Sequence, residues 1–342
     1  MDIPSEFAGD IHQVFSRKLE RSLIMKLETV KLQIHGLPVL KNLDDLSTLT
    51  RISKKTLYKC SFKSDYQYRE VSIPKKNGEN RNLSIPSRTL KALQAWILRN
   101  ILDKLHSSSS SIGFERGHSI RENALEHIGA NAMLNLDFAD FYDHIKSVHV
   151  FNLFRKVGYN NLISTILSNI CTYKGRLPQG SPCSPKIANL YCIRLDKRIQ
   201  NYVGPKGLKY TRYADDITIS GSDDRAVARI LNLVKSIISD EKLKVNEDKT
   251  RISGFGSQKT VTGLVVTESD VGIGTVKYKV LRSKFHHLAT KPTNQVNDAE
   301  INHCRGWLAY LYDVDRKRHI KFVKYISKLK DKYPHSIIAS EF

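Results

Sequence analysis

The sequence has little of what marks zinc-binding, secreted and membrane proteins. It contains five cysteines among 342 residues, an odd number, and no two of them have the CxxC spacing of a structural zinc site. We therefore expect reduced thiols in a cytoplasmic protein. No apolar run is long enough to cross a membrane. The acidic, proline-containing start MDIPSEFAGD is unlike a secretory signal.

Acidic residues are a minority of the charged ones. The chain has 34 Asp and Glu against 55 Lys and Arg, a formal net charge of +21. This excess favours a polyanionic partner, because phosphates neutralised by Lys and Arg release their counterions. The alternatives are a basic protein without a nucleic-acid role and, since no basic amphipathic segment dominates, less favourably a membrane surface. The length suits a large core and two or three subdomains.

Two stretches place carboxylates next to predicted strands. In YTRYADDITIS, residues 210–220, Asp215 and Asp216 lie between β-branched and aromatic runs, which predicts a hairpin with both aspartates at its tip. Alone, an Asp-Asp turn is more often a solvated loop. Upstream, residues 133–136 are apolar enough for a buried strand, and Asp137 falls at its end.

A third stretch, LPQGSPCSPKIANL, covers residues 177–190. Its prolines and glycine predict a rigid loop, followed by a helix with Ser184 as N-cap and Pro185 as first helical residue. Apolar residues follow at helical spacing: Ile187, Leu190, Tyr191, Leu195 and Ile199.

In this order, Asp137 with Tyr142 five residues on, LPQG and YADD resemble the palm of reverse transcriptases. The resemblance implies an α+β right-hand polymerase with fingers, an antiparallel palm sheet carrying the YADD hairpin, and a helical thumb. Two-metal phosphoryl transfer needs clustered carboxylates, which repel one another unless cations are present. We therefore expect two Mg²⁺ ions, replaceable by Mn²⁺, on Asp137, Asp215 and Asp216, with the Phe138 carbonyl as an added ligand.

The resemblance also implies dNTP contacts. Tyr142 would be the steric gate against a ribose 2′-OH, a role compatible with a core tyrosine. Gln179 and Gly180 would form the floor beside the nucleotide. Asp140 and Asp143 are expected to be solvated or capping residues, although spacing alone leaves them open as ligands.

Basic residues are predicted to contact the triphosphate. Residues 71–86 predict a hairpin with Asn77-Gly78 at the turn, similar to the fingers hairpin of polymerases. Its contacts would be Lys75, Lys76 and above all Arg81, whose guanidinium can bind phosphate oxygens in pairs. Residues 243–251 predict a strand, with Lys249 near the triphosphate.

An N-A-x-x-H pattern (residues 123–127) and a V-T-G tripeptide (residues 261–263) resemble signatures of retron reverse transcriptases. Such enzymes recognise their own structured non-coding RNA, start cDNA at an internal 2′-OH to give branched msDNA, and act with an effector or toxin protein against phage. Alternatives are a group II intron or diversity-generating enzyme, and an idle RNA-binding scaffold, against which three intact aspartates argue. RNA or primer contacts are expected from Asn123, His127, Val261, Thr262, Gly263, Arg316, Lys317 and Arg318.

The expected domains are an N-terminal helical region (1–60), fingers (61–130), a palm (131–268, with fingers-contacting helices at about 148–172) and a basic helical thumb (269–342). Within them we expect a helix over 11–34 and two short helices before residue 60, the second capped by Ser53. These form a packing element in preference to a helix-turn-helix. A helix over 89–105 and a flexible serine run at 107–111 follow. With no room for an RNase H domain, template removal is expected of another protein.

Overall fold

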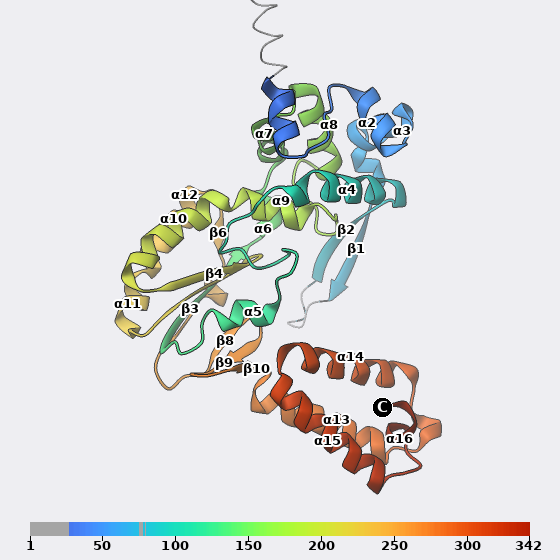
Figure 1. Cartoon of the computed structure of the whole chain (residues 1–342), viewed down its shortest axis with the longest axis vertical. Coiled ribbons are helices and arrows are strands. Elements are labelled where there is room, and N and C mark those ends of the chain that lie inside the picture. Colours follow the sequence, from blue (N-terminus) through green and yellow to red (C-terminus); the bar gives the residue numbers. More distant parts are fainter. Residues whose placement is uncertain (1–26, 75–77, 79) are drawn as a thin grey trace, which may run out of the picture. The chain divides into compact units, whose positions relative to one another are not determined.

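The computed structural model describes residues 27–74, 78 and 80–342 (Figure 1). The chain forms two compact units. Unit 1 comprises the residues up to Ser108 together with Asp140–Arg194, and unit 2 comprises Ser109–Ala139 and Leu195–Phe342. This division differs from the expected domains, because residues 109–130 fall in the unit of the palm sheet. Residues 140–194 instead join the fingers hairpin.

Unit 1 begins with helical residues 27–34, and the rest of the helix predicted from residue 11 lies outside the described residues. Two short helices follow, as predicted: α2 (Leu43–Thr50) and α3 (Lys54–Phe62). Ser53 is the N-cap of α3, where its hydroxyl accepts a hydrogen bond from the Thr56 amide. Helix α3 packs against α8 (Asn161–Cys171), in agreement with a packing role.

The predicted hairpin of unit 1 is present as β1 (Tyr68–Pro74) and β2 (Asn80–Pro86), which pair antiparallel. Most of its turn lies outside the described residues. The next helix is shorter than predicted: α4 (Arg88–Asn100) ends before residue 105, and a 3₁₀ turn, η2 (Leu102–Lys104), follows. The other short turn of this unit is η1 (Ser64–Gln67).

The second segment of unit 1 contains α6 (Phe141–His144), α7 (Ser147–Val157), α8 and α9 (Ser184–Tyr191), and α10 (Ile193–Val203) leads into unit 2. Helices α7 and α8 confirm the helices predicted near residues 148–172. The predicted N-cap of α9 is wrong by one residue. Cys183 is the cap and Ser184 is already helical, because the Ser184 hydroxyl donates 2.8 Å to the Pro178 carbonyl instead of capping the helix.

The main sheet of unit 2 has the order β4-β5-β3-β6, with β7 also paired to β3. Strands β4 (Lys209–Tyr213) and β5 (Asp216–Gly221) form the predicted hairpin, and the buried β3 (Ala132–Ala139) lies beside β5. The single strand predicted for residues 243–251 is absent. These residues form β6 (Lys244–Val245) and a 3₁₀ turn, η4 (Glu247–Lys249), before β7 (Arg251–Ser253), because both strands pair with β3 at separate places.

The serine run is not the flexible connection that its composition predicts. Ser110 and Ser111 are buried and lie along β4. The Arg212 amide donates 2.8 Å to the Ser110 carbonyl, and the Ile112 amide donates 2.9 Å to the Arg212 carbonyl. These main-chain hydrogen bonds extend the sheet by a short parallel bridge.

The remaining elements of unit 2 lie outside the main sheet, and the last helices among them form the thumb. They are α5 (Ile120–Leu125), η3 (Gly204–Lys206), α11 (Asp224–Arg229), α12 (Leu231–Asp240), the small sheet of β8 (Lys259–Val261), β9 (Leu264–Val266) and β10 (Val271–Gly272), then α13 (Gly274–Thr290), η5 (Thr293–Gln295), α14 (Asp298–Val314), α15 (Arg316–Lys332) and α16 (Ile337–Glu341).

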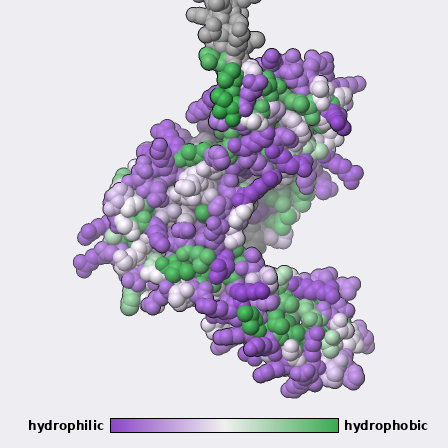
Figure 2. Space-filling view, viewed as in Figure 1, coloured by the Kyte–Doolittle hydropathy of each residue, from purple (hydrophilic) through white to green (hydrophobic). Residues whose placement is uncertain are grey.

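The thumb is helical and basic, as predicted. Its helices share a core in which the rings of Phe285 and Phe322 meet edge to face, 4.8 Å between centroids. Trp307 packs against the same core. Figure 2 shows hydrophilic residues around an apolar area on the thumb helices. Among the described helices, none has both the length and the apolar character of a membrane span.

Candidate active site

The pairing of β3 with β5 brings the predicted catalytic carboxylates together. Asp137 on β3 is the register partner of Asp216, the first residue of β5. Asp215 lies in the turn just before, and its carbonyl accepts 3.1 Å from the Phe138 amide. Ala214 makes the turn with a left-handed φ of 58°. The predicted position of both aspartates at the hairpin tip is confirmed, although Asp137 stands two residues before the end of β3 rather than at it.

The electrostatics of these groups show their mutual repulsion. Although part of Asp216 is exposed, desolvation of its carboxyl, the charge of Asp215 and the hydrogen bond and charge of Asp137 together raise its pKa to about 7, against the opposing charge of Lys249. The three carboxylates offer hard oxygen donors, which suit Mg²⁺. They fit a divalent cation, although no group of three or more His, Cys, Asp or Glu in the described part of the chain forms a ready-made metal cage.

Lys249 supplies the cation nearest to Asp137, a contact that sequence analysis missed. Its Nζ lies 2.9 and 3.0 Å from the two carboxylate oxygens of Asp137. Burial acts to lower the pKa of Lys249, but its hydrogen bond to Asp137 and the charges of the three aspartates outweigh this and raise it. The turn η4 places Lys249 here, since the Asn246 amide donates 2.8 Å to the Asp137 carbonyl just before it.

A buried ion pair is hydrogen-bonded to the YADD turn. Arg212 and Asp196 are both fully buried, and the guanidinium donates to both carboxylate oxygens at 2.8 Å. Its Nη1 also donates 2.9 Å to the Ala214 carbonyl, and its Nη2 donates 3.1 Å to the Ser111 hydroxyl. The Tyr210 hydroxyl donates 2.7 Å to Asp196. Sequence analysis missed this network, although an arginine within a buried strand requires a buried anionic partner.

The N-A-x-x-H motif has a different place from the one predicted. Asn123 and His127 are 1% and 0% exposed. The two ring nitrogens of His127 bond to the hydroxyls of Ser220 on β5 and Thr211 on β4, at 2.7 and 2.8 Å. Desolvation, aided by the charge of Lys209, lowers the pKa of His127 to about 4. The predicted direct RNA contacts of these two side chains are therefore corrected, because both side chains are buried and His127 is bonded to the sheet.

The V-T-G tripeptide forms the tight turn between β8 and β9. Val261 is fully buried, so a direct RNA contact of its side chain is corrected in the same way. Thr262 and Gly263 adopt left-handed φ values of 47° and 81° and are more accessible. The Thr262 hydroxyl donates 3.4 Å to the Ile120 carbonyl of α5, so the V-T-G turn contacts the helix that carries Asn123. The Gly263 carbonyl accepts 2.6 Å from Lys277 Nζ.

Apart from Lys249, the predicted nucleotide contacts belong to unit 1. The Gln179 carbonyl accepts 2.8 Å from the Ser84 amide of β2, and Gly180 has a φ of 133°. The LPQG loop is thus fastened to the fingers hairpin. Arg81 lies exposed on β2, whereas Lys75 and Lys76 fall outside the described residues.

Tyr142 and the acidic residues Asp140 and Asp143 also belong to unit 1. Tyr142 lies on α6 with its ring 5.5 Å from that of Phe141. Asp143 forms an ion pair of 3.3 Å with Arg176, and Asp140 precedes α6 with a left-handed φ of 46°. We expected solvated or capping residues: Asp143 is partly exposed but ion-paired, and Asp140 occupies the N-cap position without a side-chain capping hydrogen bond.

The basic cluster of α15 is partly neutralised. Lys317 pairs with Asp270 at 2.7 Å and Arg318 with Asp315 at 2.9 Å, while the Arg316 guanidinium lies 3.7 Å from the ring centre of Tyr312.

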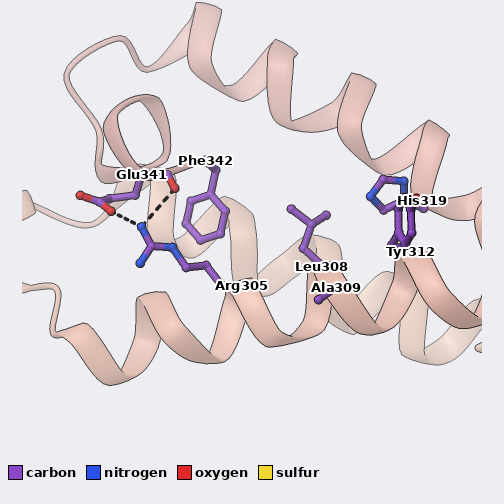
Figure 3. Close-up of a pocket in the computed structure, with 7 residues that line it drawn as sticks. All are labelled: Arg305, Leu308, Ala309, Tyr312, His319, Glu341 and Phe342. Atoms are coloured by element: carbon purple, nitrogen blue, oxygen red, sulfur yellow. Dashed lines mark hydrogen bonds and ion pairs between the residues drawn. The ribbon is translucent and has the colours of Figure 1, made fainter.

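Nearby, a cavity of about 440 Å³ opens beside α14, α15 and α16 (Figure 3). It is lined by Arg305, Leu308, Ala309, Tyr312, His319, Glu341 and Phe342.

Comparison with known proteins found one matching family and several similar proteins. A family described as "Reverse transcriptase (RNA-dependent DNA polymerase)" matches residues 73–287. The chain is 50% identical to the Retron Ec86 reverse transcriptase of Escherichia coli, over 90% of this chain and 95% of that protein. It is 31% identical to the Retron Mx162 reverse transcriptase of Myxococcus xanthus, over 77% and 61%. Among solved structures, a Candida albicans telomerase aligns with 77% of this chain and 59% of its own at 14% identity and a TM-score of 0.46.

Proposed function

Since the chain belongs to the reverse transcriptase family and is an RNA-directed DNA polymerase of the retron type, we propose that Asp137, Asp215 and Asp216 hold its catalytic metals. The observation that carries this proposal is the register of β3 and β5, which sets Asp137 opposite Asp216 with Asp215 beside them. The expected ions are two Mg²⁺, with Mn²⁺ as a substitute. The Phe138 carbonyl is proposed as an added ligand.

Bound Mg²⁺ would lower the pKa of the priming hydroxyl and stabilise the negative charge of the leaving pyrophosphate. The carboxylates fix where that charge is neutralised, and the Arg212–Asp196 pair holds the turn that carries two of them. The Lys249 ammonium, which forms an ion pair with Asp137, is the proposed triphosphate contact of unit 2. Its position supports the proposed triphosphate contact.

The proposed nucleotide pocket is built by unit 1. Tyr142 excludes the ribose 2′-OH, Gln179 and Gly180 support the nucleotide, and Arg81, with Lys75 and Lys76, binds the triphosphate. Hydrogen bonding of the LPQG loop to β2 supports a joint role of loop and hairpin. Replacing Tyr142 with Val should raise incorporation of rNTPs relative to dNTPs. Unchanged selectivity in primer extension would place the gate elsewhere.

The substrate and biological setting are proposed from the retron relatives. The protein would recognise one structured non-coding RNA, prime at an internal 2′-OH and make branched msDNA, in the cytoplasm, with an effector or toxin protein of an anti-phage system. Half-buried Thr262, exposed Gly263 and the α15 cluster of Arg316, Lys317 and Arg318 are the proposed RNA contacts. The positive charge of the chain supports RNA as the partner.

Two experiments test the proposal. Asp→Asn at any one of the three aspartates should reduce DNA synthesis by orders of magnitude. Each aspartate helps to hold a metal that stabilises the charge of the transition state by about several kcal/mol. RNA binding should persist. Extension at the wild-type rate by Asp215→Asn would reject the metal assignment and leave an RNA-binding scaffold.

The second experiment examines the product. With its cognate RNA and labelled dNTPs, the protein should attach the first dNMP to an internal 2′-OH, giving a branched product that debranching enzyme cleaves. Synthesis only from an added primer, with an ordinary 3′–5′ linkage, would keep the polymerase and reject retron priming, in favour of a group II intron or diversity-generating type.

A further inference from the structure

Helix α3 presents two aromatic rings and several lysines to solvent on one side. Its buried side chains are Leu57, Cys60 and Ser61. Away from this buried side, Tyr58 and Phe62 are 51% and 47% exposed. Their rings lie 4.9 Å apart at helical spacing, one turn from each other. This side of the helix, with the lysines described next, is called the α3 face.

Lysines alternate with the rings of the α3 face. Lys55 and Lys59 lie on the same side of the helix by the 3.6-residue period, and Lys63 follows at its end. All three are exposed, and within the described part of the chain they have no ion pair or side-chain hydrogen bond. The nearest acids in sequence are already engaged: Asp45 accepts from the Lys41 and Asn42 amides, and Asp65 accepts from the Lys174 amide.

This arrangement is unfavourable for the isolated helix. Helix α3 has no acidic residue in its first turn, where the positive end of the helix dipole favours one. Like charges four residues apart, as in Lys55, Lys59 and Lys63, repel each other. Residues 51–63 carry five basic and no acidic side chains. A bound polyanion would relieve each of these unfavourable terms.

The composition of the α3 face decides between two kinds of partner. Protein interfaces are depleted of lysine, so a lysine-rich aromatic face fits a protein poorly. Single-stranded nucleic acid fits it, because unpaired bases stack on aromatic rings and phosphates pair with cations. We propose that the α3 face, centred on Tyr58 and Phe62, is a binding site for single-stranded nucleic acid. The inference rests on the proposed function only in making nucleic acid the polyanion.

The test uses the full-length protein without dNTPs or divalent metal, so that it is independent of the catalytic aspartates. A fluorescent oligouridine of about 12 nucleotides, within the usual range of single-strand sites, is titrated at several salt concentrations. An oligothymidine of equal length distinguishes RNA from cDNA as the strand bound. A duplex of the same length serves as a probe whose bases are not available for stacking.

The two groups of side chains should give different results. Tyr58→Ala with Phe62→Ala should weaken single-strand binding by about tenfold or more, with an unchanged salt slope, since stacking releases no counterions. Tyr58→Trp with Phe62→Trp should keep the affinity. Replacing Lys55, Lys59 and Lys63 with Gln should lower the log–log salt slope by about 2, at about 0.7 for each phosphate.

A matched control removes the same charge elsewhere. Lys91, Lys156 and Lys197 are exposed on α4, α7 and α10, and their replacement with Gln should leave slope and affinity near wild type. The proposal is overturned if this control weakens binding as much as the α3 lysine variant. It is also overturned if the variant with Tyr58→Ala and Phe62→Ala binds the oligonucleotide normally. The same holds if that variant loses only the association of the protein with itself. Normal binding by the α3 variants, with synthesis lost in Asp215→Asn, would reject this site and keep the proposed function.

Discussion

His127 is a buried side chain whose charge state should control stability. Its pKa of about 4 lies below the ordinary 6.5, so between these values the unfolded chain binds a proton that the folded chain does not. Stability present above pH 6.5 should therefore be lost as the pH falls toward 4, by on the order of 3 kcal/mol in total.

Urea unfolding at pH 7 and pH 5 measures this effect. His127→Gln, which cannot titrate but can still bond to the hydroxyls of Thr211 and Ser220, should unfold with a flatter pH dependence than the wild type. If wild type and variant lose equal stability between the two pH values, the histidine is not the group responsible.

The Arg212–Asp196 pair gives a second prediction for single residues. Asp196→Asn leaves a buried guanidinium without its counter-charge, so the free energy of unfolding should fall by about 3–5 kcal/mol. Arg212→Met combined with Asp196→Leu should be less harmful, because no unpaired charge remains. Denaturant titrations of the three proteins compare these values. A double variant less stable than Asp196→Asn would contradict the explanation.

The positions of site residues in the fold were predictable where a short motif carries them. Asp215 and Asp216 follow from four consecutive letters, and Asp137 from a strand with a carboxylate near its end. The partners Lys249 of Asp137 and Arg212 of Asp196 were not predictable, because each depends on the register between distant segments. For the same reason, the burial of His127 under the hairpin could not be read from its place after a short helix.

At the scale of elements, the LPQG loop and β2 depend on close contact of their backbones. A Cβ on Gly180 would lie 2.6 Å from the Ser84 carbonyl oxygen, and the φ of 133° is strained for any other residue. Gly180→Ala should therefore destabilise the protein by about 1–3 kcal/mol and reduce synthesis.

Gly175→Ala is a control for this substitution. Gly175 also has a positive φ, of 74°, but a Cβ there would meet nothing within 4 Å, so its effect measures the backbone term alone. Thermal unfolding and primer extension of both variants separate the two terms. Equal losses in both would show that contact with Ser84 is unimportant.

Elements were predicted well where local pattern determines them. The hairpins β1–β2 and β4–β5 and the helices α2, α3, α7 and α8 all lie near the predicted residues. Predictions failed where a tertiary contact overrides local preference. Ser110 and Ser111 are held by β4, and residues 243–251 are divided because two parts of β3 each bind one half.

At the scale of the molecule, the excess of positive charge predicts salt-sensitive RNA binding. Replacing Arg316, Lys317 and Arg318 with Gln should weaken binding of the cognate RNA and lower the log–log salt slope. Two of these cations already pair with Asp270 and Asp315, so we expect a decrease of about 1 rather than 3.

The control for this prediction again loses three charges, at Lys91, Lys156 and Lys197. Filter binding at several salt concentrations compares the two variants with the wild type. Equal slopes for all three proteins would show that the α15 cluster is only a solvated surface.

The order of the two units along the chain constrains how such a gene can recombine. The chain passes between them at residues 108–109, 139–140 and 194–195, so each unit is encoded in two separate pieces. A single crossover between two diverged genes, placed at residue 194, would join β3 of one parent to β5 of the other. Asp137 and Asp216 would then be inherited from different ancestors, as would Ser111 and Arg212. Descendants should therefore inherit these segments together, and viable chimaeras should require two exchanges.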